Sequence, residues 1–157
     1  MLRYEQKDIT TVTEGIILQG CNAQGVMGSG VAKAIRDKWP GVFAEYKRAC
    51  DQCVVKSDLL GACILYDVTD LPVCIVNAIT QEFYGKDGKV YANKNAIDTA
   101  ILTTCLVAGG ESTGSVNIYL PKIGCGLGGL NWDLDIKPIV ESYAAIYPMY
   151  DFIVCEV

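Results

Sequence analysis

The sequence predicts an α/β sandwich, because strand-like and helix-like segments alternate along it and two glycine-rich loops follow strand-like segments. The first loop lies within NAQGVMGSGVA, residues 22–32, and the second within GCGLGG, residues 124–129. In an open α/β sheet, ligands bind in a crevice outside the carboxyl ends of the strands. We therefore expect both loops to line one binding crevice.

The composition indicates a single domain that covers residues 1–157. Hydrophobic residues make up 51% of the chain and charged residues 20%, which is typical of globular proteins and not of disordered ones. No repeat, low-complexity tract or linker divides the sequence. The chain is long enough for one core and too short for two comfortable ones.

The N-terminal part is predicted to form two strands and then a helix. Strands are expected at residues 2–5 and 15–19, where GIILQ is an apolar run short enough to be a strand buried on both faces. Beyond the first glycine loop, apolar residues recur four apart. This spacing predicts a helix over residues 30–39 that ends at Pro40 and has Ser29 as its N-cap.

A second helix is predicted over residues 41–53, and its apolar stripe includes Cys50 and Cys53, the one C-x-x-C motif of the sequence. No second cysteine pair at zinc-ribbon spacing and no histidine accompany this motif, so no metal site is expected. The cysteines inside apolar segments are interpreted as small core residues in a reducing compartment. These are Cys21, Cys63, Cys74, Cys105 and Cys155.

The rest of the chain is predicted to alternate in the same way. Residues 80–91, TQEFYGKDGKVY, are interpreted as a polar loop. A helix that begins at residue 93 and covers residues up to 107 is expected to end at Gly109 and Gly110, since glycine often terminates helices. The remaining predicted elements are strands at residues 62–68, 73–79, 115–120 and 150–157 and a helix at 132–147.

The charge pattern excludes several classes of partner. A net charge of -5 without a basic stripe argues against a nucleic-acid polymer. No apolar run is long enough to span a bilayer, and the N-terminus MLRYEQKDIT carries charge where a signal peptide would be apolar. We therefore expect a cytoplasmic monomer without a membrane partner. A small anionic ligand stays compatible with this charge, because backbone N–H groups at a helix start bind phosphate.

The glycines of the two loops permit positive φ angles and let main-chain N–H groups approach a ligand closely. One such loop alone is best interpreted as a tight turn, whereas two loops at equivalent strand ends favour a pyrophosphate clamp. GCGLGG matches the dinucleotide pattern G-x-G-x-x-G, but it lies near the end of the chain and not in the first βαβ unit. A redox Rossmann enzyme is therefore not expected, and the missing Gly-Lys-Ser/Thr excludes a Walker A loop.

Four separated motifs resemble those of macro domains: KDIT at residues 7–10, GCNAQGVMGSGVAKAI at 20–35, NAITQEFYGKDGKVY at 77–91 and LPKIGCGLGGLNW at 120–132. The resemblance covers essentially the whole chain and is strongest to the stand-alone branch that includes yeast-type and phage ADP-ribose-1''-phosphate phosphatases. It implies a three-layer α/β/α sandwich with a central mixed, mostly parallel sheet. It also implies a small-molecule ligand, ADP-ribose or its 1''-phosphate, and no cofactor.

The resemblance assigns binding roles to residues of these motifs. Asp8 is expected to accept a hydrogen bond from the adenine amino group, with the backbone of Ile9 beside it, and Asn22 to lie near the distal ribose. Tyr84 is interpreted as stacking on an adenine or ribose face. The two phosphate loops are expected to comprise Gly28, Ser29, Gly30 and Val31, and Gly124, Cys125, Gly126, Leu127 and Gly128. The residues alone also allow structural roles: turns for Asp8 and Asn22, and a cover over the core edge for Tyr84.

Catalytic residues are indicated less directly, since the chain has no histidine to act as a general base. Cys125 is interpreted first as a small structural residue and second as a nucleophile, because no arginine follows at the spacing of a cysteine phosphatase loop. The resemblance implies that related glycohydrolases use a lysine and an aspartate. This sequence has Gln81 with Glu82 and Gly128 at those places.

A water positioned by Asn22 and Ser29 is left as the expected nucleophile, so these two residues are the catalytic candidates. The predicted function is to bind ADP-ribose and to hydrolyse the phosphate of ADP-ribose-1''-phosphate, as a phosphoric monoester hydrolase. The alternatives are a non-catalytic ADP-ribose reader and an ADP-ribosyl hydrolase or O-acetyl-ADP-ribose deacetylase.

Overall fold

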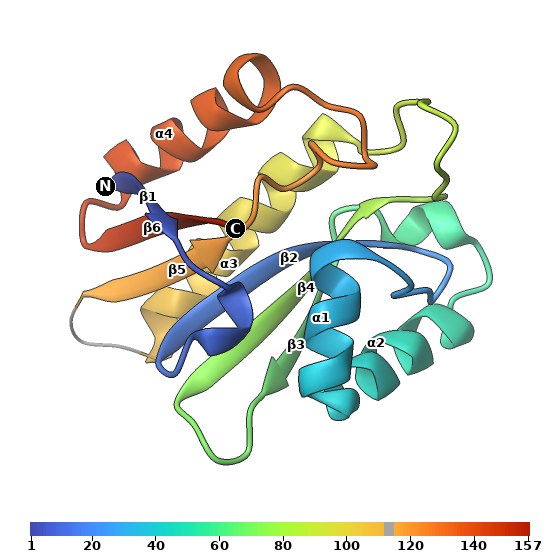
Figure 1. Cartoon of the computed structure of the whole chain (residues 1–157), viewed down its shortest axis with the longest axis horizontal. Coiled ribbons are helices and arrows are strands. Elements are labelled where there is room, and N and C mark those ends of the chain that lie inside the picture. Colours follow the sequence, from blue (N-terminus) through green and yellow to red (C-terminus); the bar gives the residue numbers. More distant parts are fainter. Residues whose placement is uncertain (112–114) are drawn as a thin grey trace.

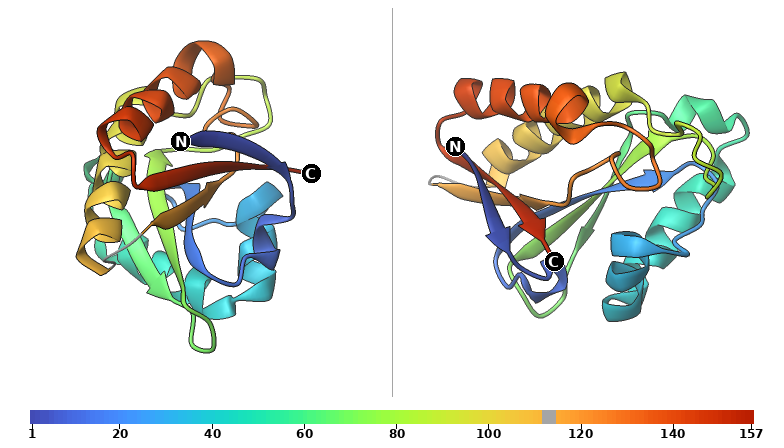
Figure 2. Two further views of the ribbon diagram at one scale, coloured as in Figure 1. Left: turned by 90° about the vertical axis from the view of Figure 1, so that its left-hand side faces the viewer. Right: turned by 45° about the horizontal axis from the view of Figure 1, so that its top comes forward.

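A six-stranded sheet lies between two pairs of helices in the computed structural model, which describes residues 1–111 and 115–157 (Figures 1 and 2). The strands are β1 (Leu2–Gln6), β2 (Gly15–Asn22), β3 (Cys63–Asp67), β4 (Val73–Gln81), β5 (Val116–Leu120) and β6 (Tyr150–Glu156). Their order is β1-β6-β5-β2-β4-β3, and every neighbouring pair is parallel except β3 with β4. The expected three-layer sandwich with a mixed, mostly parallel sheet is thus confirmed.

The helices cover both faces of the sheet (Figure 2). They are α1 (Gly30–Lys38) and α2 (Pro40–Gln52) on one face, and α3 (Lys94–Glu111) and α4 (Lys137–Ile146) on the other. Ile17 of β2 belongs to the core under α1 and α2, whereas its neighbours Ile16 and Leu18 belong to the core under α3 and α4. A strand covered on both faces is apolar at almost every position, which explains the run GIILQ. Within the described residues, no helix has both the length and the apolar character that crossing a bilayer requires.

Helix α3 continues through the two glycines at which the sequence predicted its end. It ends at Glu111, beyond Gly109 and Gly110. At Gly109 a Cβ atom would lie 2.9 Å from Tyr150 Oη, and that hydroxyl donates to Cys105 O over 3.1 Å. The glycine therefore lets α3 pack closely on β6, so its role is packing and not termination.

The helix predicted over residues 132–147 is divided into two pieces. Trp132–Ile136 form a single π-helical turn, and α4 follows it from Lys137. Pro138 lies in the first turn of α4, where a missing N–H is tolerated, and it cannot donate back into the turn before it. Pro40 likewise begins α2 directly after α1, in addition to ending the earlier helix.

All eight cysteines are free thiols. Of the five cysteines predicted as core residues, Cys63 is partly buried and the other four are buried. The buried ones are Cys21, Cys74, Cys105 and Cys155. Cys50 is buried in α2, but Cys53 follows the end of that helix and is partly exposed. The stripe predicted through both cysteines therefore ends at Cys50, because Cys53 has an extended backbone and donates from N to Cys50 O over 3.2 Å.

Candidate functional site

Three parallel strands end at one edge of the sheet and leave it in different directions. β2 leads to α1 on one face, whereas its neighbours β4 and β5 lead to α3 and α4 on the other (Figure 1). Such a reversal opens a crevice at the carboxyl ends of the strands. A cavity of about 720 Å³ lies at this place, a size typical of small-molecule sites.

Both glycine loops line this cavity, as do the end of β2 and the loop after β4. Most of the residues predicted from the sequence are brought together here. The predicted residues that line the cavity are Asn22, Gly28, Ser29, Gly30, Val31, Tyr84, Gly124, Gly126, Leu127 and Gly128. Asp8, Ile9 and Cys125 are not among the lining residues.

The side chain of Asn22 holds the first glycine loop in shape. Its Oδ1 accepts hydrogen bonds from Gln24 N at 3.0 Å and Val26 N at 3.3 Å, and its Nδ2 donates to Val26 O at 2.8 Å. The oxygen is therefore occupied, while one of the two Nδ2 hydrogens is left. Asn22 is set up to donate to a ligand and not to accept from it.

A tyrosine of α2 completes this network from behind the loop. Tyr46 is 0% exposed, and its Oη accepts a hydrogen bond from Val26 N over 3.1 Å. The hydroxyl donates to Asn22, whose backbone O lies at 2.6 Å and whose Oδ1 lies at 2.9 Å. Burial raises the pKa of the Tyr46 phenol, so the hydroxyl keeps the proton that it donates.

Helix α1 begins at the cavity without a side-chain cap. Ser29 occupies the N-cap position, which confirms the prediction, and its hydroxyl makes no capping hydrogen bond. Gly30 enters the helix with a φ of 62° and lines the cavity together with Val31. The first N–H groups of a helix lack intrahelical partners and form the positive end of its dipole. This helix start is therefore suited to a phosphate or another anion.

The second glycine loop is built by close packing of its backbone. A Cβ atom at Gly128 would lie 2.6 Å from Gly124 O, and one at Gly124 would lie 2.7 Å from the Ile97 side chain. Gly128 O accepts hydrogen bonds from Tyr91 N at 2.9 Å and Ala92 N at 3.0 Å. At Gly128 the contact is with backbone, and at Gly124 a φ of 78° also favours glycine, so the loop keeps its backbone at the cavity surface.

The cavity wall carries positive charge in a chain whose net charge is -5. Lys86 and Lys122 line it, and no aspartate or glutamate does so in the described part of the chain. Lys122 Nζ also pairs with Glu156 Oε2 over 3.2 Å. Sequence reasoning missed both lysines, because a single lysine in a loop is a common surface residue and its spacing to the glycines indicates nothing.

Gln19 is a third lining residue, and it was not among the site residues predicted from the sequence. It is 1% exposed and donates from Nε2 to Asn77 Oδ1 over 2.7 Å, while Asn77 Nδ2 donates to Ile64 O over 3.1 Å. This chain of bonds orients both amides and leaves Gln19 Oε1 without a donor among the described residues. A polar amide at the end of the apolar run GIILQ is the sequence signal that could have indicated it.

Asp8 and Ile9 lie at the start of the short helical turn that follows β1 and are not part of the cavity lining. Asp8 Oδ1 accepts hydrogen bonds from Thr10 N at 2.9 Å and Thr10 Oγ1 at 2.7 Å, which lower the pKa of the carboxyl group. The Ile9 side chain is buried in the core. The residue before Asp8 donates from its backbone N–H to Glu156 O over 2.8 Å, and the Glu156 carboxylate pairs with Lys122 of the wall. Asp8 is therefore joined to the cavity wall only through its neighbour in sequence and Glu156, and its Oδ1 is engaged locally.

Cys125 belongs to the second glycine loop but does not line the cavity. Its Sγ donates to Ile123 O over 3.3 Å, and burial raises the pKa of the thiol to about 11. At neutral pH the group is a protonated thiol, which is a poor nucleophile. The geometry supports the structural interpretation of Cys125 over the nucleophilic one.

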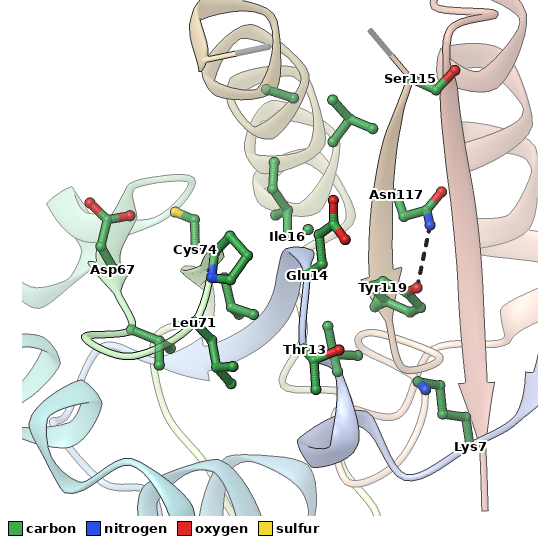
Figure 3. Close-up of a pocket in the computed structure, with 17 residues that line it drawn as sticks. Lys7, Thr13, Glu14, Ile16, Asp67, Leu71, Cys74, Ser115, Asn117 and Tyr119 are labelled. Atoms are coloured by element: carbon green, nitrogen blue, oxygen red, sulfur yellow. Dashed lines mark hydrogen bonds between the residues drawn. The ribbon is translucent and has the colours of Figure 1, made fainter.

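A second cavity, of about 680 Å³, lies at the opposite edge of the sheet, where β2, β4 and β5 begin (Figure 3). Asn117 Nδ2 donates there to Tyr119 Oη over 3.4 Å, and Lys7 Nζ lies 5.8 Å from the centre of the Tyr119 ring. Neither glycine loop lines this cavity, and no predicted site residue does. The candidate functional site is therefore the cavity between the glycine loops.

Comparisons with known proteins point to one family. The Macro domain family model matches residues 18–137 of the chain. The ADP-ribose 1''-phosphate phosphatase of Candida albicans is 26% identical over 150 residues, which cover 91% of this chain and 94% of that protein. The DNA ADP-ribosyl glycohydrolase of Mycobacterium tuberculosis is 25% identical over 158 residues, which cover 94% of this chain and 42% of that protein.

A solved structure of the same kind supports the fold. The macrodomain of Mycobacterium tuberculosis DarG matches with a TM-score of 0.83 at 22% identity, over 100% of this chain and 98% of that one. The chain thus corresponds to a whole macrodomain in that structure, whereas it spans 42% of the length of the mycobacterial glycohydrolases.

Proposed function

The chain belongs to the macro domain family, and from this premise we propose that it binds ADP-ribose and hydrolyses the phosphate of ADP-ribose 1''-phosphate. The observation that carries the proposal is the uncapped start of α1, which shares one cavity with the second glycine loop. Main-chain N–H groups and two lysines line that cavity, and these groups suit a ligand that carries several phosphate charges.

The proposed ligand runs along the cavity with its pyrophosphate between the two glycine loops. Asn22 donates its remaining Nδ2 hydrogen to the distal ribose, since its Oδ1 is occupied by the loop backbone. The adenine lies at the other end, where Asp8 Oδ2 accepts from the exocyclic amino group beside the backbone of Ile9. Tyr84 lines the cavity and is 53% exposed, so its ring is available to stack on the ligand.

Hydrolysis in this proposal uses a positioned water and no protein nucleophile. The hydroxyl of Ser29 makes no capping bond, so it is the side chain at the α1 start that orients the water. The water oxygen bonds to phosphorus, the bond from phosphorus to the 1'' oxygen breaks, and a water proton passes to the leaving oxygen. The α1 N–H groups stabilise the charge on the phosphate, and positioning without a strong base leads to slow turnover.

The phosphatase and glycohydrolase relatives match this chain at similar identity over most of its length, and one observation on its residues supports a phosphatase. Gln81 and Gly128 stand where the resemblance to glycohydrolases implies a lysine and an aspartate, and Gln81 Nε2 is bonded to Phe83 O at 2.7 Å. A non-catalytic ADP-ribose reader is the second candidate, because the described lining residues include no carboxylate to act as a base.

Calorimetry with ADP-ribose, followed by a phosphate-release assay on ADP-ribose 1''-phosphate, tests the proposal. We expect binding and slow release of inorganic phosphate. Absence of binding at millimolar ADP-ribose would contradict the whole proposal. Binding without release would contradict the phosphatase alone and leave the reader.

The adenine end is tested by Asp8→Ala. A hydrogen bond to a charged group contributes about 1.5–3 kcal/mol, so ADP-ribose affinity should fall by about tenfold or more. Ribose 5-phosphate, which has no adenine, serves as the control ligand in the same calorimetric titration and should lose little. Equal losses for both ligands would refute the adenine role of Asp8.

A further inference from the structure

Lys86 is the cation of the candidate site that pairs with no carboxylate in the part of the chain that the structure describes. Of the two lysines that line the cavity, Lys122 pairs with Glu156 over 3.2 Å. Lys86 takes part in none of the ion pairs formed among residues 1–111 and 115–157. At the cavity, Lys86 is therefore available to form an ion pair with an anionic group of the ligand.

The carboxylate next to Lys86 in sequence is bonded within its own loop. Asp87 Oδ1 accepts hydrogen bonds from Tyr91 Oη at 2.8 Å and Lys89 N at 3.2 Å, and Oδ2 lies 3.7 Å from Lys89 Nζ. These bonds, that from Tyr91 above all, lower the pKa of Asp87. Asp87 does not line the cavity, so its charge is held by its own loop and not by Lys86.

Backbone hydrogen bonds fasten the loop that carries Lys86 to both glycine loops. Tyr91 N donates to Gly128 O of the second loop over 2.9 Å. Ala23 N of the first loop donates to Gln81 O over 2.9 Å. With its two ends fixed in this way, the loop keeps Lys86 at the cavity, although the side chain itself is exposed.

We propose that Lys86 recognises a terminal phosphate on the ligand and so selects ADP-ribose 1''-phosphate over ADP-ribose; this inference rests on the proposed function. Ala23, to which the loop is bonded, follows Asn22, the residue assigned to the distal ribose. This bond fastens one end of the loop that carries Lys86 beside the residue assigned to the distal ribose, and we place the terminal phosphate at that end. The N–H groups at the start of α1 stabilise part of the charge of the terminal phosphate, and Lys86 adds to them a cation with three rotatable donors.

Binding of the two ligands to Lys86→Met tests the proposal. Stopped-flow fluorescence separates binding from the slower turnover, and the wild-type protein should bind ADP-ribose 1''-phosphate more tightly than ADP-ribose. Lys86→Met should lose about tenfold in affinity for the 1''-phosphate and less than about twofold for ADP-ribose, which lacks the added charge. Lys86→Arg keeps the charge and should keep the preference, and added salt should weaken it.

Lys89→Met is the matched control, since Lys89 is an exposed lysine of the same loop that lies beside Asp87 and does not line the cavity. It should leave both affinities unchanged, and melting temperatures should show that both variants fold. Equal losses for the two ligands in Lys86→Met, no loss there, or an equal loss in Lys89→Met would overturn the inference. Wild-type protein that binds neither ligand would overturn the proposed function instead, so the two failures are distinguishable.

Discussion

The two glycine loops line the same cavity, but different forces hold them. The first is held by side chains: Asn22 bonds to the backbone of Val26 and Gln24, and Tyr46 supports both ends of that turn. At Gly28, the nearest atom to an added Cβ would be 3.6 Å away, so space is not what shapes this loop. The second loop is shaped by the close contacts that exclude any Cβ at two of its glycines.

The helices that follow the two loops also begin differently. Ser29 leaves the start of α1 uncapped at the cavity. Asn131, after the second loop, accepts a hydrogen bond at Oδ1 from Leu134 N over 2.9 Å and so caps the π-helical turn. The comparison indicates that the two loops have different roles. The first loop leads into a helix N-terminus that is open to an anion, and the second forms a rigid wall on the opposite side of the cavity.

The largest effect should come from filling the closely packed loop with Gly128→Ala. The added Cβ would lie 2.6 Å from Gly124 O and 2.9 Å from the Ala92 side chain, so backbone must move. We expect a loss of about 3 kcal/mol in the free energy of unfolding, which corresponds to a fall of roughly 10 °C in Tm, measured by calorimetry. ADP-ribose affinity should fall with it.

Gly126→Ala is the matched control for stability, because no atom lies within 4 Å of a Cβ atom added there and its φ is not positive. Its Tm should stay within about 2 °C of the wild type. If both alanine variants lowered Tm equally, close packing would not be what fixes the second loop.

The next largest effect should come from Tyr46→Phe, which removes the support of the first loop. The variant keeps the buried ring but deprives Val26 N and Asn22 O of the hydroxyl. We expect a loss of about 1–2 kcal/mol in stability and about tenfold in ADP-ribose affinity, because the Asn22 amide and the turn that it holds lose the hydrogen bonds from behind the loop. Chemical denaturation and calorimetric titration measure the two quantities.

Tyr150→Phe separates the loss of a buried hydroxyl from the loss of loop support. Tyr150 Oη donates to Cys105 O over 3.1 Å in the core near α3, away from both loops. This variant should lose a similar amount of stability with unchanged ADP-ribose affinity. Equal affinities in the two phenylalanine variants would mean that Tyr46 does not position the loop.

The strands and the position of the two glycine loops were predictable from the sequence, because they depend on local patterns of residues. Apolar runs such as GIILQ predicted strands covered on both faces, and the position of glycines after such strands predicted loops at one edge of the sheet. The glycine pattern failed at Gly109, since the same residue that ends a helix also permits close packing, and only the position of Tyr150 distinguishes the two.

The remaining features could not be predicted, because their partners are distant in sequence. Tyr46 fitted the apolar stripe of α2, and its bond to Asn22 joins residues 24 positions apart. Lys86 has no neighbouring pattern that separates it from Lys89, and only the fold places one lysine at the cavity and leaves the other outside. The resemblance indicated which residue types stand at the matching positions. Which donors and acceptors of these residues are still free to bind a ligand can be read only from the hydrogen-bond network of the folded chain.

The smallest expected effect is on stability, and it concerns the residues that precede the two helix starts. It is measured by comparing Ser29→Ala with Asn131→Ala. Replacing an N-cap side chain that accepts a bond costs about 1 kcal/mol of stability, so Asn131→Ala should lose that amount and keep ADP-ribose affinity and phosphate release. Ser29→Ala loses no capping bond, so its stability should change by less than about 0.5 kcal/mol, while phosphate release slows. Denaturation curves and the phosphate-release assay measure both variants. A stability loss in Ser29→Ala as large as in Asn131→Ala would show that Ser29 caps α1 in solution, and the start of α1 would then be less open to a phosphate than its geometry indicates.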